Sequence, residues 1–173
     1  MKFDASIVQT RYLSPLGMMV LAATHAGLAG VWFEGQRHLP DELASASGWP
    51  ANPGHRVLIE TAAQLTQYFA GHRSGFDVPL DLSGGTAFQQ SVWQALRRIE
   101  PGQTSSYSNV SKSIGNAAAV RAAAAAVARN PVSIIVPCHR VLGSDGSMTG
   151  YAGGIDRKAA LLRLEGVRHK GLL

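Results

Sequence analysis

The sequence has little cysteine. Cys138 is the only one in 173 residues, so no disulfide can form within the chain, and a zinc site built from several cysteines is excluded. Two interpretations of Cys138 remain: a small buried hydrophobic residue or a reactive thiol. A single free thiol also fits a reducing compartment, which favours a cytoplasmic location.

Long apolar runs are also missing. No segment approaches the roughly 20 apolar residues that a helix needs to cross a bilayer. The start, Met1-Lys2-Phe3-Asp4, lacks the apolar stretch of a signal peptide. We therefore expect no membrane partner. With 46% hydrophobic and 16% charged residues, the chain is expected to fold around one large core or two small ones.

Acidic residues are scarce in the second half of the chain. Residues 86–173 contain eleven Lys or Arg and only four Asp or Glu, a net charge of +7, whereas residues 1–85 carry −2. Twelve of the sixteen cations in the chain are arginine, whose planar guanidinium suits contacts with phosphates and bases. This distribution predicts a polyanionic partner, with nucleic acid as the first candidate and an unengaged basic surface as the alternative.

Residues 1–85 have the pattern of a small α/β domain. Three short apolar segments separated by turn residues predict an antiparallel sheet with strands at 6–13, 18–24 and 28–33. Residues 35–54 contain Gly, Pro, Ser and Asn and predict a loop, and an apolar stripe predicts a helix from Arg56 to Ala70. Residues 71–85 resemble a linker, and we place the domain boundary in its last residues, 81–85.

Residues 86–173 are predicted to form a mostly α-helical second domain. Thr86 and Gln89 have the spacing of a helix capping box, which places a helix start at the domain boundary. An apolar stripe continues this helix until Pro101-Gly102 closes it. A last helix is expected from about Ile155 to Glu165.

A helix-turn-helix is predicted between these two helices. Ser108 could cap a short helix that ends at Ile114. Gly115-Asn116 would form the turn, and the second helix would occupy residues 117–129. This second helix is nearly all alanine, so it could let another helix approach closely, or it could present a slim face to a DNA groove. Arg121, near its start, could contact a phosphate, lie unengaged on the surface, or insert into the base stack.

Cys138 lies in Pro137-Cys138-His139-Arg140-Val141, directly after an apolar run. Proline, histidine and arginine are uncommon core residues, and they supply a bend, a base and a positive field to a thiolate. Adjacent side chains of a strand point to opposite faces, so Cys138 and His139 can cooperate only if the chain turns there. Glu165 could orient the histidine, or it could be an exposed carboxylate paired with Arg163 or Arg168.

A thiol on a DNA-binding domain suggests chemistry on a base. A thiol cannot reach a base atom inside a duplex unless the nucleotide is flipped out, and Arg121 could then fill the gap. Tyr107 could press on a phosphate or stack on a base, and the alternative is a half-buried tyrosine with a satisfied hydroxyl. The small residues after Tyr151 could close over a planar ligand, or they could form a plain loop before the last helix.

Together these residues resemble the O6-alkylguanine-DNA alkyltransferase family, also called methylated-DNA–protein-cysteine methyltransferases. The family's Pro-Cys-His-Arg-Val motif matches residues 137–141, and ordered matches extend over residues 86–166. They are Phe88-Gln89, Val92-Trp93, Tyr107, Arg121-Ala122, Asn130-Pro131, residues 150–154, Lys158, Leu161-Leu162 and Glu165-Gly166. Residues 1–85 resemble the family's more variable N-terminal α/β domain only loosely.

The resemblance implies a stoichiometric DNA repair reaction. Cys138 would take an alkyl group irreversibly from O6-alkylguanine, and from O4-alkylthymine, in duplex DNA after nucleotide flipping. His139 would deprotonate the thiol through a water, Glu165 would orient His139, and Asn130 would steady the active-site loop. No cofactor and no metal are required, and a monomer is expected.

The resemblance also assigns residues to the DNA and to the base. Arg121 would replace the flipped nucleotide, with Ala119 and Ala122 beside it on a helix in the minor groove. Tyr107 would crowd the phosphate, contact the guanine and donate a proton to it as it leaves. The pocket for the base would be lined by Val127, Val141, Tyr151, Ala152 and Gly153.

Some positions depart from the family pattern. Ser108 and Ala124 stand where glycine is frequent, and Glu100-Pro101 replaces the more usual order. None of these changes removes a chemical role, but they bear on DNA affinity and rate.

Two other classes of protein fit part of the sequence. A lesion sensor or a helix-turn-helix regulator would bind DNA without chemistry, and Cys138 argues against the sensor, because sensors related to the family lack the reactive cysteine. A thiol hydrolase would use the cysteine, but its histidine usually comes from a distant segment, whereas His139 is adjacent.

Overall fold

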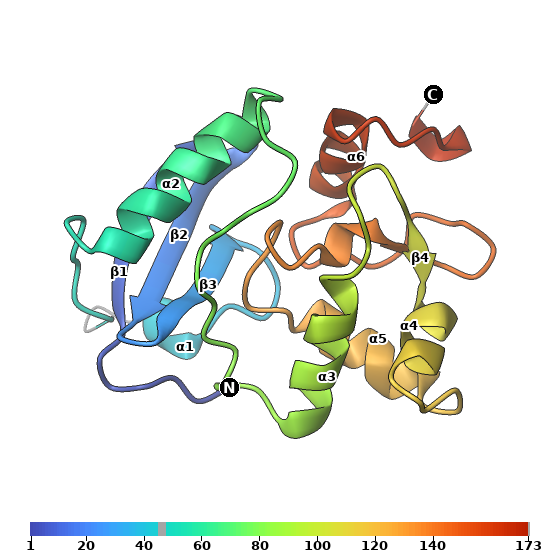
Figure 1. Cartoon of the computed structure of the whole chain (residues 1–173), viewed down its shortest axis with the longest axis horizontal. Coiled ribbons are helices and arrows are strands. Elements are labelled where there is room, and N and C mark those ends of the chain that lie inside the picture. The colour runs from blue at the N-terminus through green and yellow to red at the C-terminus, as the bar shows by residue number, and fades with distance from the viewer. Residues whose placement is uncertain (45–47, 173) are drawn as a thin grey trace. The chain divides into compact units, whose positions relative to one another are not determined.

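The chain forms two compact units, Met1–Gly85 and Thr86–Leu173 (Figure 1). The structure is a computed structural model, and it describes residues 1–44 and 48–172. Within those residues, no helix is long and apolar enough to cross a membrane.

Unit 1 is built on a three-stranded antiparallel sheet in the order β1-β2-β3 (Figure 1). The strands are β1 (Val8–Ser14), β2 (Gly17–Thr24) and β3 (Gly27–Phe33), so the three predicted strands are confirmed with bounds shifted by one or two residues. Gly27 has φ +149, and a Cβ at this position would lie 2.7 Å from the carbonyl oxygen of Pro79. Only glycine therefore lets the linker run alongside the start of β3.

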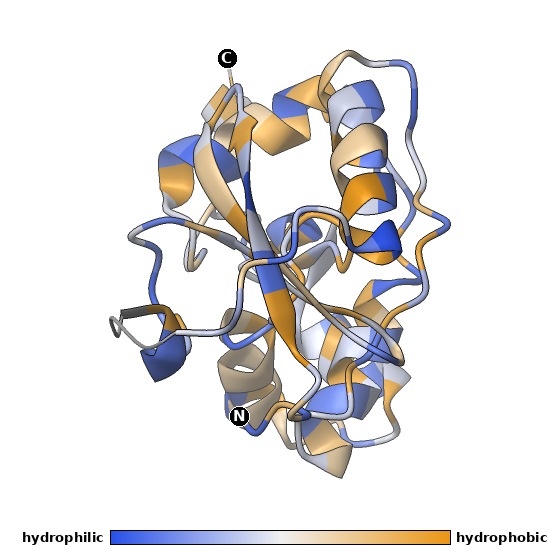
Figure 2. Cartoon of the chain, turned by 90° about the vertical axis from the view of Figure 1, so that its left-hand side faces the viewer, coloured by the Kyte–Doolittle hydropathy of each residue, from blue (hydrophilic) through white to orange (hydrophobic). Residues whose placement is uncertain are grey.

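Helix α2 (Arg56–Phe69) contacts all three strands. Hydrophobic and hydrophilic residues alternate along its ribbon (Figure 2), and the helix buries Leu58, Leu65 and Tyr68. The chain leaves the helix at Gly71, whose φ of +74 suits a helix end. The predicted helix is therefore confirmed.

The segment 35–54 is more ordered than the predicted loop. It contains a short helix, α1 (Asp41–Ala44), and Ala51 forms a bridge with Gln9 of β1. A helix of one turn leaves no periodic pattern in a sequence, which explains why the prediction missed it. Residues 45–47 of the predicted loop lie outside the described residues.

Unit 2 begins with helix α3 (Ala87–Leu96). The predicted capping box is confirmed: Thr86 Oγ1 accepts the Gln89 N–H at 3.2 Å, and Gln89 Oε1 accepts the Thr86 N–H at 2.9 Å. The indole of Trp93 is buried and donates a 2.8 Å hydrogen bond to the carbonyl oxygen of Ala126. This bond ties α3 to the alanine-rich helix.

Helices α4 (Tyr107–Ser113) and α5 (Val120–Ala128) follow each other and pack together, with Gly115 in the turn between them. The predicted cap was wrong, because Ser106 rather than Ser108 accepts the Asn109 N–H, at 3.1 Å. The second helix begins at Val120 instead of residue 117. Alanine has no side-chain oxygen with which to cap a helix, so the alanine run gave no start signal.

The remaining elements of unit 2 are short, except for α6 (Ile155–Leu164), which confirms the last predicted helix. Strands β4 (Ser105–Ser106) and β5 (Val141–Leu142) form a parallel pair that the sequence did not predict. Strands of two residues are too short for alternation to be visible. Two 3₁₀-helices, η1 (Cys138–Arg140) and η2 (Lys170–Leu172), complete the unit.

Candidate active site

The segment before Cys138 has a strained backbone. Ile134 is fully buried and has φ +72, a conformation that β-branched residues rarely adopt. Asn130 holds this segment from inside: its Oδ1 accepts the Val132 N–H at 3.0 Å and its Nδ2 donates to the Val136 carbonyl oxygen at 2.7 Å. The buried amide thus fixes the path of the chain into the Pro-Cys-His-Arg-Val motif.

Cys138 and His139 lie in 3₁₀-helix η1 rather than in a strand. With three residues per turn, neighbouring side chains project about 120° apart, so they do not point to opposite faces. The exposed fractions are 5% for Cys138 and 0% for His139. The turn that cooperation between these two residues requires is therefore present.

Opposing effects act on the pKa of the Cys138 thiol. Burial raises its pKa, while a 3.1 Å hydrogen bond from Asn130 Nδ2, the charge of Lys158 and the backbone N–H groups of Cys138 and His139 lower it. Burial has the largest effect, so the pKa lies above that of an ordinary thiol. At neutral pH the group is therefore a neutral thiol, and hydrogen-bond donors are placed to stabilise a thiolate.

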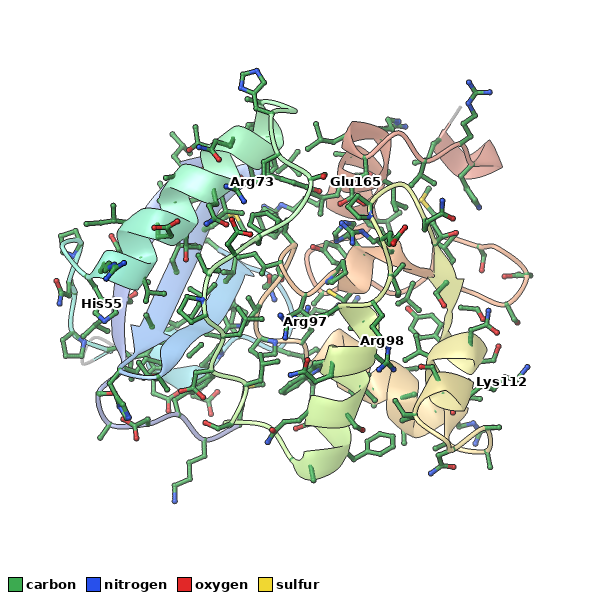
Figure 3. The ribbon with its side chains drawn as sticks, in the orientation of Figure 1. His55, Arg73, Arg97, Arg98, Lys112 and Glu165 are labelled. Carbon is green, nitrogen blue, oxygen red and sulfur yellow. The ribbon has the colours of Figure 1, made fainter. Side chains whose placement is uncertain are left out.

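Glu165, labelled in Figure 3, is buried and contacts both His139 and Arg140. Its Oε1 lies 2.9 Å from His139 Nε2, and its Oε2 accepts from Arg140 Nε at 2.8 Å. Burial opposes ionisation of this carboxyl, but hydrogen bonds from Arg140 and His139 hold its pKa well below the usual range. The alternative of an exposed carboxylate paired with Arg163 or Arg168 is wrong, because the Glu165 side chain is only 3% exposed.

The surroundings of His139 favour the neutral imidazole. Burial lowers its pKa, and the charges of Arg140 and Lys158 lower it further, against the opposing effect of Glu165. An ionised carboxylate only accepts hydrogen bonds, so Nε2 carries the proton and Nδ1 keeps its lone pair. Nδ1 is buried and has no hydrogen-bond partner among the described residues.

Lys158 is a fully buried cation of α6. Its Nζ donates to the carbonyl oxygens of Val141, at 2.6 Å, and Thr149, at 3.0 Å. Burial lowers its pKa to about 8, against the opposing charge of Cys138. Lys158 was expected only as a match to the family pattern, and no partner was predicted for Arg140. A lone cation in a sequence cannot be told from a surface charge.

Tyr107 is half-buried, and its hydroxyl shares a hydrogen bond between the carbonyl oxygens of Thr149 (3.2 Å) and Gly150 (3.1 Å). The alternative of a half-buried tyrosine with a satisfied hydroxyl therefore describes the geometry. Burial and the charge of Cys138 raise its pKa.

Helix α5 has a buried side that packs against other helices and an exposed side. Ala123, Ala126 and Val127 are buried, and the helix contacts both α3 and α4. Arg121 and Ala122 are exposed, and Ala119 is half-buried at the N-cap. Close helix packing and a slim exposed face are therefore both present in the same helix.

The other residues expected around a base are mostly buried. Val141 is fully buried, Tyr151 and Gly153 are buried, and Ala152 is half-buried. Burial raises the pKa of Tyr151 well above its usual value, with a smaller effect of Cys138. In the part of the chain that the structure describes, no group of three His, Cys, Asp or Glu residues could hold a metal ion.

Comparison with known families decides the relationship. The 6-O-methylguanine DNA methyltransferase DNA binding domain matches residues 87–167, and the ribonuclease-like domain of the same methyltransferases matches residues 7–82. The chain belongs to the 6-O-methylguanine DNA methyltransferase family. The resemblance of the Pro-Cys-His-Arg-Val motif to this family is thereby confirmed, and it extends to the first unit.

Relatives of this methyltransferase family cover most of the chain. A methylated-DNA–protein-cysteine methyltransferase of Mycolicibacterium paratuberculosis is 43% identical over 152 residues, 88% of each chain. One of Methanosarcina acetivorans is 46% identical over 154 residues, 88% of this chain and 94% of its own. The crystal structure of Mycobacterium tuberculosis OGT in complex with DNA is 43% identical, with a TM-score of 0.78 over 92% of this chain and 91% of that one.

Proposed function

We propose that this chain repairs O6-alkylguanine in duplex DNA by transferring the alkyl group to Sγ of Cys138. The observation that carries the proposal is a single buried thiol that receives a hydrogen bond from Asn130 and adjoins a histidine backed by an ionised carboxylate. Relatives of matching length are named for transfer from methylated DNA to a protein cysteine. A module that only binds DNA is not favoured, because it has no use for this cluster.

The reaction starts with a proton transfer. Because the thiol is protonated at rest, Nδ1 of His139 takes its proton, through a water as the family resemblance implies. Glu165, hydrogen-bonded to Nε2, stabilises the imidazolium that forms. Asn130 and the backbone N–H groups of η1 stabilise the thiolate.

The second step is a displacement at carbon. The thiolate attacks the alkyl carbon, an S–C bond forms, the C–O6 bond breaks, and the electron pair goes to guanine, which takes up a proton. We assign Tyr107 as the donor of that proton, which requires its hydroxyl to leave the carbonyl oxygens of Thr149 and Gly150. The C–S bond of the product thioether is stable, because a thiolate is a poor leaving group, so each molecule acts once. The balance needs no cofactor.

We assign α4 and α5 as a helix-turn-helix that binds DNA. Arg121 and Ala122 are exposed on α5, and Lys112 extends outward from α4 (Figure 3). The crystal structure of the M. tuberculosis relative with DNA supports this partner. Arg121 would fill the space left by the flipped nucleotide, beside Ala119 and Ala122.

The flipped base would be enclosed by the buried and half-buried residues near the thiol. We assign this lining to Val127, Val141, Tyr151, Ala152 and Gly153. O6-alkylguanine is the main substrate in this proposal, and O4-alkylthymine is a second one. Because the thiol must stay reduced until it is used, we also propose a reducing, cytoplasmic compartment. We further propose that the protein acts as a monomer, since one molecule carries the one thiol that the reaction uses.

A titration tests the proposed function. An excess of duplex with O6-methylguanine is incubated with known amounts of protein, and repaired guanine is counted. We expect one guanine repaired per protein molecule and none with Cys138→Ala, whose duplex binding serves as the control for folding. Multiple turnovers, or repair by Cys138→Ala, would contradict the proposal.

A further inference from the structure

Arg140 is a buried arginine that directly follows the Cys138–His139 pair. Its Nε and Nη2 donate 2.8 Å hydrogen bonds to Oε2 and Oε1 of Glu165, and its Nη1 donates to the carbonyl oxygen of Ile99. Two parallel bonds fix the plane of the carboxylate, and the Ile99 carbonyl fixes the guanidinium from the other side. Glu165 is therefore held in one orientation.

This orientation leaves one position for the proton of His139. Oε1 of Glu165 lies 2.9 Å from Nε2 of His139, and the same oxygen accepts from Arg140 at 2.8 Å. An oxygen that already binds a cation is ionised and cannot donate, so Nε2 must be the N–H of the ring. A carboxyl that could turn or protonate would also allow the other tautomer, in which Nδ1 carries the proton and cannot act as a base.

The charge of Arg140 has a second consequence for the ring. Helix η1 packs against α6, and the charged groups of these elements that act on His139 are Glu165, Arg140 and Lys158. Glu165 favours the imidazolium, while Arg140 and Lys158 disfavour it. Arg140 therefore offsets the carboxylate that it clamps, and the imidazole stays neutral until the thiol gives up its proton.

We propose that Arg140 is a positioning residue for alkyl transfer: by clamping Glu165, it fixes the His139 tautomer that leaves Nδ1 free to accept the thiol proton. The role in the reaction rests on the proposed function, whereas the tautomer follows from the geometry alone. The two parts can be tested separately.

Nitrogen-15 NMR of the histidine rings tests the tautomer in the unreacted wild-type protein. The His139 signals are assigned by their loss in His139→Gln. We expect Nε2 of His139 to be protonated and Nδ1 to be unprotonated near neutral pH. A proton on Nδ1, or a ring protonated on both nitrogens, would overturn the proposal. This measurement needs no alkyl transfer, so its failure is distinct from failure of the proposed function.

The pH dependence of the repair rate tests the role in the reaction. Arg140→Gln removes the charge and one of the two parallel bonds, so we expect the plateau rate to fall about 10-fold and the acidic limb to move up by about one pH unit. Arg140→Lys keeps the charge, so its plateau should fall while its acidic limb stays in place. Arg168→Gln, at an exposed arginine three residues after Glu165, should match wild type.

Circular dichroism establishes that each variant is folded before its rate is compared. A folded Arg140→Gln with the wild-type plateau and the wild-type acidic limb would refute the role of Arg140. If Arg140→Gln does not fold, Arg140→Lys decides: a wild-type plateau in this variant would likewise refute the clamp.

Discussion

At the scale of residues, burial and hydrogen bonds keep each group of the site in the protonation state that the proposed reaction needs at its start. Burial raises the pKa of the Cys138 thiol, burial lowers the pKa of His139, and hydrogen bonds from Arg140 and His139 keep Glu165 ionised despite its burial. A neutral thiol next to a neutral imidazole avoids a buried ion pair before DNA arrives. In the proposed reaction, the proton moves from the thiol only as the thiolate is used.

Asn130 is the side chain that favours the thiolate directly, so Asn130→Ala should raise the pKa of the Cys138 thiol. The change also leaves the Val132 N–H and the Val136 carbonyl oxygen without their partner, which should cost about 2 kcal/mol of stability. The rate of alkylation by iodoacetamide against pH reports the thiol alone, because the chain has one cysteine. Asn109→Ala, at an exposed asparagine of α4, is the matched control. An unchanged alkylation profile in folded Asn130→Ala would contradict this assignment.

Acid should destabilise the protein through His139. Its folded pKa is lower than its unfolded value of about 6.5, so the unfolded chain binds the proton more readily. The contribution is complete above about pH 6.5 and is lost as pH falls below that value, by up to about 1.4 kcal/mol per pH unit. Urea unfolding at several pH values measures this slope. His139→Gln should show a flatter dependence between about pH 7 and pH 5, and an equal slope would contradict the account.

The sequence predicted part of this cluster and missed the rest for a physical reason. Cys138 and His139 are neighbours in the chain, Glu165 was a candidate because acidic residues are scarce in this half, and the role of Asn130 came from the family resemblance. Arg140 was expected only to supply a positive field. Its bonds to Glu165 and Ile99 span 25 and 41 residues along the chain, and no local pattern encodes contacts of that range.

At the scale of elements, the predictions succeeded where a local pattern was strong. The three strands of unit 1 and helix α2 follow apolar periodicity, and the start of α3 follows the capping box of Thr86 and Gln89. The two-residue strands depend on pairing between distant segments. The start of α5 has no capping side chain, and Ser106 and Ser108 are both plausible caps in the sequence. These features left no signal that the sequence alone could resolve.

Helix α5 presents Arg121 for the proposed contact with DNA. Arg121 is exposed and lies outside the buried cluster, so Arg121→Ala should weaken repair of duplex DNA by about 10-fold and reaction with the free alkylated base much less. The two rates are measured with the same protein preparation. Arg56→Ala, at an exposed arginine of α2, is the control for loss of a positive charge. Equal losses on duplex and free base would contradict the assignment of Arg121 to the DNA.

At the scale of the whole molecule, the charge of the chain is divided between its units. Residues 86–173 carry +7 and residues 1–85 carry −2, and the thiol lies in the basic unit. A protein that neutralises phosphates releases counterions, so duplex binding should weaken steeply as salt rises. Fluorescence anisotropy over a salt series measures the slope. Binding that does not change with salt would contradict a role for this charge.

We propose Cys138, the one thiol of this chain, as the alkyl acceptor. Peptide mass mapping after incubation with a duplex that contains O6-methylguanine tests this assignment. We predict one added methyl group on the peptide that contains Cys138, no addition with unmodified duplex, and no addition in Cys138→Ala. A fully bound lesion beside an unmodified Cys138, or a methyl group on another residue, would contradict the account.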